Sequence, residues 1–162
     1  MARGNEILVT GTEPKGRVSN GYVGSTYTFK PGMIVQKDPT IALKSGRHTY
    51  KPFTRGTSGK RPAGAAWLVL NDAMKGDIQT STYAAGEIVQ LYALQSGDEF
   101  NGLLADVAGT GDSHTAGEVL ILQDATGKFI ATTGSPVFDC ALLLENVTQP
   151  SADTLAWMEW GG

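Results

Sequence analysis

Short runs of apolar residues, separated by glycine-containing turns, dominate the pattern of this sequence. The clearest example is residues 83–105, in which two glycine turns flank an apolar run over 88–94 and a second run begins at Phe100. Apolar runs of this length between Gly and Asp turns are typical of β-strands. Because Ile88 and Val89 are both apolar, the run predicts a strand that is buried largely on both faces.

The same short pattern occurs three times along the chain. Residues 116–122 (AGEVLIL) repeat residues 85–91 (AGEIVQL), and residues 31–36 (PGMIVQ) are a fainter copy. Each copy is a glycine turn that leads into a strand. None of them carries a nucleophile, a general base or a cluster of metal ligands, so the repeat indicates a structural β module rather than an active site.

The rest of the chain continues this alternation of strands and turns, and no window keeps an apolar face at helical spacing. The 21 glycines are spread over the whole chain, as expected for many tight turns. The pattern therefore predicts an all-β fold, either a small β-barrel or a compact β-sandwich. The expected strands cover 7–9, 33–35, 65–70, 78–83, 88–94, 100–105, 119–122, 129–131, 137–146 and 154–160, and the expected core residues are Ile88, Leu91, Val119, Leu122, Leu143 and Trp157.

Two segments differ from this pattern. Residues 1–30 hold few large apolar side chains and cannot easily form a core, so we expect an extended N-terminal arm; an ordinary edge strand of the same domain is the alternative. Residues 31–162 are then a single β domain. Within it, residues 44–64 are basic and rich in Gly and Pro, which predicts a long loop.

Charge is distributed unevenly, although the formal net charge is only -3. Residues 1–62 hold 11 Lys and Arg against 3 acids, whereas residues 63–162 hold 2 Lys against 13 acids. Both blocks can simply be solvated surface. The alternative is that the basic segment docks on an acidic surface, which belongs either to a partner or to a neighbouring copy.

Patterns for catalysis and metal binding are scarce. A single cysteine excludes an intramolecular disulfide, and His48 and His114 have no second ligand at zinc spacing. Ser113 precedes His114, but neighbouring positions do not supply the geometry of a nucleophile and its base, so a small hydrolase is only an alternative. We expect no enzyme, no cofactor and no bound metal. Four loop acids offer oxygen ligands for calcium without EF-hand spacing: Asp98, Glu99, Asp106 and Asp112.

Membranes and nucleic acids are not expected as partners. The N-terminus lacks the apolar segment of a signal peptide, and no apolar stretch approaches the roughly 18 residues of a membrane span. Residues 44–61 interleave basic and aromatic side chains, which suits phosphate contacts and base stacking. The acidic remainder of the chain would repel a nucleic-acid backbone.

The phrasing Tyr83-x-x-Gly86-Glu87-x-Val89, then residues 96–99 (SGDE) and 116–119 (AGEV), and a closing Trp157-x-x-Trp160 strand resembles capsid decoration (cement) proteins of tailed bacteriophages. This resemblance implies a small β-rich virion protein that binds the outside of the expanded head and ties neighbouring subunits of the major capsid protein together. It also implies a homo-oligomer, with a trimer favoured, and assembly in the host cytoplasm. Many such proteins use an N-terminal arm for the contact.

The arm and the basic loop are the expected contact regions. In the arm we expect Arg3, Lys15, Arg17, Tyr22 and Tyr27 to contact the capsid, and in the loop Lys51, Phe53 and Arg55. A receptor- or glycan-binding module, such as a head fibre, is the alternative function, with Trp160 and Tyr92 as exposed ligand platforms.

Overall fold

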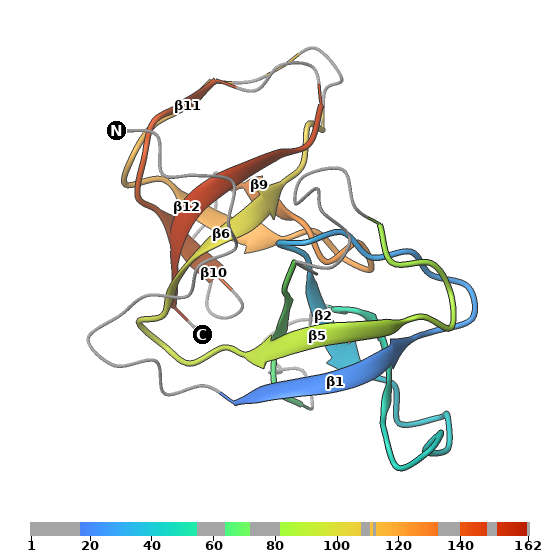
Figure 1. The fold of residues 1–162 in the computed structure, drawn as a ribbon. Helices are drawn as coiled ribbons and strands as arrows, with labels where there is room; N and C mark the ends of the chain where they lie inside the picture. The colour runs from blue at the N-terminus through green and yellow to red at the C-terminus, as the bar shows by residue number, and fades with distance from the viewer. Residues whose placement is uncertain are drawn as a thin grey trace.

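The apolar runs of the sequence form β-strands that close into two small barrels (Figure 1). The computed structural model describes residues 17–54, 64–71, 82–107, 111, 113–132, 140–148 and 152–161. Barrel 1 contains β1 (Val18–Val23), β2 (Ile34–Lys37), β3 (Thr49–Pro52), β4 (Trp67–Val69) and β5 (Ile88–Ala93). Barrel 2 contains β6 (Glu99–Leu104), β8 (Val119–Leu122), β9 (Phe129–Ala131), β10 (Cys140–Leu143) and β12 (Thr154–Trp160), and beside it β7 (Ser113–His114) pairs with β11 (Val147–Thr148).

Both barrels have the same topology. In each, the first strand in the chain pairs in parallel with the third and antiparallel with the fifth, and the remaining pairs are antiparallel. The register also agrees. Val23 faces Tyr50 in barrel 1 as Leu104 faces Phe129 in barrel 2, so Tyr50 and Phe129 occupy equivalent positions. The all-β prediction is confirmed, and the barrel is the closed form that it takes.

The register explains the sequence repeat. Gln36 faces Lys51 as Ile121 faces Ile130, which makes β2 the equivalent of β8. The copies at 31–36 and 116–122 therefore lead into equivalent strands, whereas the copy at 85–91 leads into β5, the last strand of barrel 1.

The same glycine turn precedes four of these strands. Its glycine has a positive φ between 80° and 93°, a conformation that residues with a Cβ rarely adopt. The residue after the glycine then accepts a hydrogen bond from a backbone N–H three positions earlier, which closes the turn. The four pairs of glycine and accepting side chain are Gly32 with Met33 Sδ, Gly86 with Glu87 Oε2, Gly97 with Asp98 Oδ2 and Gly117 with Glu118 Oε1.

Each barrel is filled by the inward-facing residues of its strands, and the interior of barrel 2 is continuous with the contact between the barrels. On β2, β4 and β5 the outward side chains Ile34, Leu68 and Tyr92 are buried as well. They pack in one cluster with interior residues of barrel 2, including Phe129 and Trp160. The outer face of barrel 1 thus covers one end of barrel 2.

A backbone contact fixes this arrangement. The amide of Ile34 donates to the carbonyl of Gly127 at 2.7 Å, and the amide of Leu103 donates to the carbonyl of Gly32 at 2.9 Å. Residues 32–34, which we call the bridging segment, therefore lie between β6 and β9 of barrel 2.

In barrel 1 the equivalent gap is closed without a bridge. There the amide of Tyr22, the counterpart of Leu103, donates directly to the carbonyl of His48 at 3.0 Å. The next hydrogen bond along is present in both barrels. The amide of Gly24 donates to the carbonyl of Tyr50 in barrel 1, as the amide of Ala105 donates to the carbonyl of Phe129 in barrel 2. Barrel 2 has thus exchanged one bond of its own for two bonds to barrel 1.

Several predictions of detail were wrong. Residues 18–23 of the predicted arm form β1 inside barrel 1, and residues 49–52 of the predicted loop form β3. Ile88 is 49% exposed and Val119 is 38% exposed, so neither is a core residue. Both begin strands with their side chains on the outer face, where the neighbouring barrel does not reach. The other expected core residues are buried: Leu91, Leu122, Leu143 and Trp157.

Candidate interaction site at the mouth of barrel 1

The two barrels differ most at one end, which we call the mouth. It is formed by the starts of the first, third and fourth strands and by the ends of the second and fifth. In barrel 2 large apolar side chains fill the mouth, because Phe100, Leu122 and Trp160 are all buried. By register, the equivalent positions of barrel 1 hold Ser19, Lys37 and Ala93, which leave it open.

The open mouth of barrel 1 is a pocket of about 540 Å³, a volume within the range of ligand-sized clefts. Four of its lining side chains carry or can carry positive charge: Arg17, Lys37, Arg47 and His48. The rest of the lining is Ser19, Asn20, Gly46, Trp67 and Ala93, so none of the lining residues is acidic.

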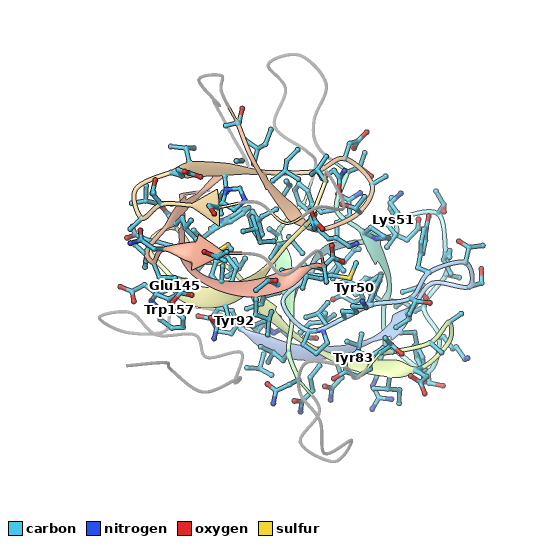
Figure 2. All side chains as sticks on the ribbon, turned by 90° about the horizontal axis from the view of Figure 1, so that it is seen from above. Tyr50, Lys51, Tyr83, Tyr92, Glu145 and Trp157 are labelled. Atoms are coloured by element: carbon cyan, nitrogen blue, oxygen red, sulfur yellow. The ribbon has the colours of Figure 1, made fainter. Side chains whose placement is uncertain are left out.

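An aromatic pair forms the floor of the mouth. The rings of Trp67 and Tyr50 meet edge to face with centroids 5.8 Å apart, and the ammonium of Lys37 lies 5.6 Å from the Trp67 ring. Such a cation–π contact holds the Lys37 charge at the rim of the pocket. Burial raises the pKa of the Tyr50 hydroxyl, which is consistent with its place inside the barrel (Figure 2).

The connection from β2 to β3 overhangs the mouth and projects from the body of the molecule (Figure 1). Residues 39–48 are exposed, including the apolar side chains Ile41 and Leu43. The tip is a tight turn in which Lys44 and Arg47 exchange two backbone hydrogen bonds of 3.0 Å. We call residues 39–48 the mouth loop.

Polar contacts anchor the base of this loop. The Asp38 carboxylate accepts bonds from the hydroxyl and amide of Thr40, at 2.7 and 3.0 Å, and lies 3.8 Å from the Lys51 ammonium. These bonds, those from Thr40 first, lower the pKa of Asp38. At the other side, the Lys44 ammonium lies 4.7 Å from the Tyr22 ring centroid.

Charge separates the two barrels as it separates the two parts of the sequence. In the described part of residues 17–94, six Lys and Arg stand against Asp38 and Glu87. In the described part of residues 95–161, Lys128 stands against eight acids. The mouth of barrel 1 is therefore the basic end of a polarised molecule.

The structure brings some of the predicted contact residues together at this end. Arg17 lines the mouth, Tyr22 lies under Lys44, and Lys51 pairs with Asp38 at the base of the mouth loop. Tyr27 is half-buried, with its ring close to Gly24.

Phe53 is instead 2% exposed and packs in the core shared by the two barrels, so its prediction as a contact residue was wrong. Its amide donates to the carbonyl of Ile34, which fixes it beside the bridging segment. Arg3, Lys15 and Arg55 lie outside the described residues.

Sequence reasoning missed Lys37 and Trp67 as members of this site. Trp67 was assigned only to a buried strand, and Lys37 to the end of one. The period-2 alternation of β2 carried the signal, because it places Lys37 on the same inward face as Val35. Arg47 and His48 belong to the basic stretch 44–61 that the sequence singled out.

The alternative chemistries fit the structure less well. Ser113 is exposed and His114 is buried on β7, so their side chains point to opposite faces of the strand. His114 Nδ1 lies 3.0 Å from Glu118 Oε2, in a contact that does not include Ser113. Trp160 and Tyr92, predicted as exposed glycan platforms, are both buried, so that prediction was wrong.

Metal-ligand clusters and membrane helices are not features of the described residues. No group of three or more His, Cys, Asp and Glu gathers in the part of the chain that the structure describes. The same part of the chain forms no helix of the length and apolarity that crossing a bilayer requires.

Comparison with known proteins gives a match of fold. No family model matches the sequence, and no curated protein matches it. Among solved structures, the chain is similar to the N base of the head fiber protein gp8.5 of bacteriophage phi29. The TM-score is 0.53 at 9% sequence identity, and the match covers 90% of this chain and 94% of that one. The shared fold therefore extends over nearly the whole of both chains.

Proposed function

We propose that this chain is a structural protein of a bacteriophage head, which binds the outer surface of the capsid across junctions between subunits of the major capsid protein and stabilises the shell. It is made and assembled in the host cytoplasm and has no catalytic role. The observation that carries this proposal is the match, over nearly the full length, to the N base of a phage head fiber protein.

The physical design suits such a task. A shell protein resists mechanical load through many modest contacts that symmetry repeats, so it needs a rigid body and exposed docking groups rather than a cleft with reactive side chains. Two apolar cores supply the rigid body, one inside barrel 1 and one that joins the interior of barrel 2 to the outer face of barrel 1. Exposed side chains on the surface of this body supply the docking groups.

Mixing the protein with purified heads tests the proposal. We expect co-sedimentation with expanded heads, little with unexpanded ones, and an increase in the temperature at which the decorated heads release their DNA. Binding to neither form of the head would contradict the proposal. A second candidate, a base that carries a head fibre or receptor-binding segment, is favoured by the likeness to a head fiber base. It predicts binding to heads at few sites with no change in their heat resistance.

A further inference from the structure

The two barrels present equivalent surfaces, but only one pair of these surfaces is in contact within the chain. Inside the chain, the outer face of barrel 1 covers the mouth of barrel 2, through Ile34, Leu68 and Tyr92. The equivalent of the outer face of barrel 1 is the outer face of barrel 2, and the equivalent of the barrel 2 mouth is the barrel 1 mouth. Among the described residues, nothing covers the mouth of barrel 1 or the part of the outer face of barrel 2 around Val119 and Leu142, although Leu103 of the same face packs against barrel 1.

The outer face of barrel 2 carries a row of four side chains that are partners in adjacent strands. Val119 faces Leu142, Leu142 faces Glu159, and Glu159 faces Glu99. By register this row is the equivalent of Ile34, Leu68, Tyr92 and Val18 on barrel 1. We call it the acidic row.

The exposure of equivalent residues differs between the two faces. Ile34 and Leu68 are each 0% exposed, whereas Val119 and Leu142 are 38% and 39% exposed. Strand pairing is the same, so the difference arises from the cover that barrel 1 has and barrel 2 lacks.

The acidic half of the row holds two carboxylates in register. Like charges on directly opposed strand positions destabilise a sheet unless a cation or hydrogen bonds offset them. Glu99 Oε2 accepts one bond from Trp157 Nε1 at 3.1 Å. Among the described residues neither Glu99 nor Glu159 has a Lys or Arg partner within salt-bridge distance.

The mouth of barrel 1 has the complementary chemistry. Arg17, Lys37, Arg47 and His48 line it without an acid, and the mouth loop above it exposes Ile41 and Leu43. An apolar pair beside two carboxylates on one surface thus matches an apolar pair beside a group of cations on the other. Complementary potentials of this kind select a partner and set its orientation.

From these observations we propose that the acidic row of one copy docks on the mouth and mouth loop of barrel 1 of a second copy, so that the chain associates head to tail. Glu159 and Glu99 of one copy then pair with the cations of the next, chiefly Arg47 and Lys37. The contact is heterologous, and such a contact forms a ring when the rotation between copies closes and a filament when it does not. The proposal goes beyond the capsid-binding function and is tested on the purified protein alone.

Two substitutions separate the two halves of the contact. Arg47→Glu changes an exposed residue at the tip of the mouth loop, and Glu159→Lys changes a half-exposed residue of the acidic row. By light scattering after size exclusion, we expect the wild type to be an oligomer and each variant to associate at least about 30-fold more weakly, the loss typical of an interfacial charge pair. Lys30→Glu, a charge reversal at a half-buried residue that belongs to neither surface, is the control.

Mixing the two variants tests whether the mouth and the acidic row meet in one contact. An Arg47→Glu copy keeps its acidic row, and a Glu159→Lys copy keeps its mouth. In the mixture the kept row faces the kept mouth, and the lysine introduced at position 159 faces the glutamate introduced at position 47. We therefore expect the equimolar mixture and the Arg47→Glu/Glu159→Lys double variant both to recover association. A monomeric wild type at 100-fold the concentration used for the variants, a wild-type mass in both single variants, or a mixture that stays monomeric would each overturn the proposal. None of these results depends on whether the protein binds phage heads.

Discussion

Barrel 1 and barrel 2 have one topology and one register, yet they solve the problem of closing a small barrel in different ways. Barrel 2 fills its mouth with large apolar side chains, takes residues 32–34 into its sheet and is covered by its neighbour. Barrel 1 completes its own hydrogen bonds and leaves its mouth open and basic. The difference teaches that two barrels of one topology can divide their roles, since one fills its mouth with apolar side chains while the other keeps an open, basic mouth.

The swapped tryptophans show this division within a single pair of strands. In barrel 1, Trp67 on β4 faces Ala93 on β5. In barrel 2, Ala141 on β10 faces Trp160 on β12. Each mouth therefore holds one indole, on the fourth strand in barrel 1 and on the fifth in barrel 2.

The largest expected effect breaks the connection between the barrels. Gly127 has a φ of +70°, and a Cβ at this position would lie 2.3 Å from the carbonyl oxygen of Ile34. We expect Gly127→Ala to lower the free energy of unfolding by about 4 kcal/mol, from backbone strain and a clash with backbone. Urea unfolding followed by tryptophan fluorescence measures it.

Gly46 in the mouth loop is the matched control. Its φ is +74°, but a Cβ there meets nothing within 4 Å. Gly46→Ala is expected to cost only about 1 kcal/mol, which is the strain of the backbone alone. Equal losses in the two variants would show that the close approach to Ile34 does not hold the barrels together.

The second prediction compares equivalent residues on the two outer faces. Leu68→Ala removes a side chain that is fully covered by barrel 2, and we expect a loss of about 3 kcal/mol in the free energy of unfolding. Leu142→Ala, at the equivalent position of barrel 2, is expected to cost less than about 1 kcal/mol in the monomer. Thermal and urea unfolding at low protein concentration would give both values, and similar losses would remove the claimed asymmetry.

The third prediction sharpens the comparison of the mouths. Trp67→Ala leaves the floor of the barrel 1 mouth empty and should destabilise the protein. Adding Ala93→Trp rebuilds the arrangement of barrel 2, so we expect the double variant to recover about 2 kcal/mol of the loss, a coupling typical of residues in contact. Ala93→Trp in the wild-type background is the control, and additive losses would contradict the equivalence of the two mouths.

The smallest effect concerns pH. Hydrogen bonds from the Thr115 amide and from His114 lower the pKa of Glu118 below its ordinary value of 4.5. A carboxyl whose pKa is lower in the folded state stabilises the protein above pH 4.5 and loses that contribution as pH falls through the folded value. Glu118→Gln should therefore lower the free energy of unfolding by about 1 kcal/mol at pH 7. It should also reduce the fall of that free energy as the pH is lowered below 4.5. Met33, at the equivalent turn of barrel 1, does not titrate, so Met33→Leu should leave that fall unchanged.

Local structure was predictable from the sequence because turns and alternation are local properties. The strands at 119–122, 129–131 and 154–160 were predicted with the bounds that the structure has. The glycine repeat correctly marked turns that lead into strands, and two of its copies lead into equivalent strands of the two barrels.

The closing of each barrel and the covering of one barrel by the other were not predictable, because both depend on contacts between segments that are distant in the sequence. Nothing in the alternation of β2 shows that its outer residue Ile34 is covered by barrel 2 while Val119, in the same pattern, is exposed. The same limit applies to the site. From the sequence, Lys37 is only the end of a predicted strand. Its register with Tyr50 is what places it at the mouth of barrel 1, beside Arg17 and Arg47.

The bridging segment also orders the events of synthesis. Residues 32–34 leave the ribosome long before β6 and β9, between which they insert. Barrel 1 can therefore close before barrel 2 is synthesised. Barrel 2 completes the hydrogen bonds of its sheet only when the bridging segment of a folded barrel 1 is present. A fragment beginning near residue 95 should accordingly stay aggregation-prone, and the complete polypeptide should melt in one step.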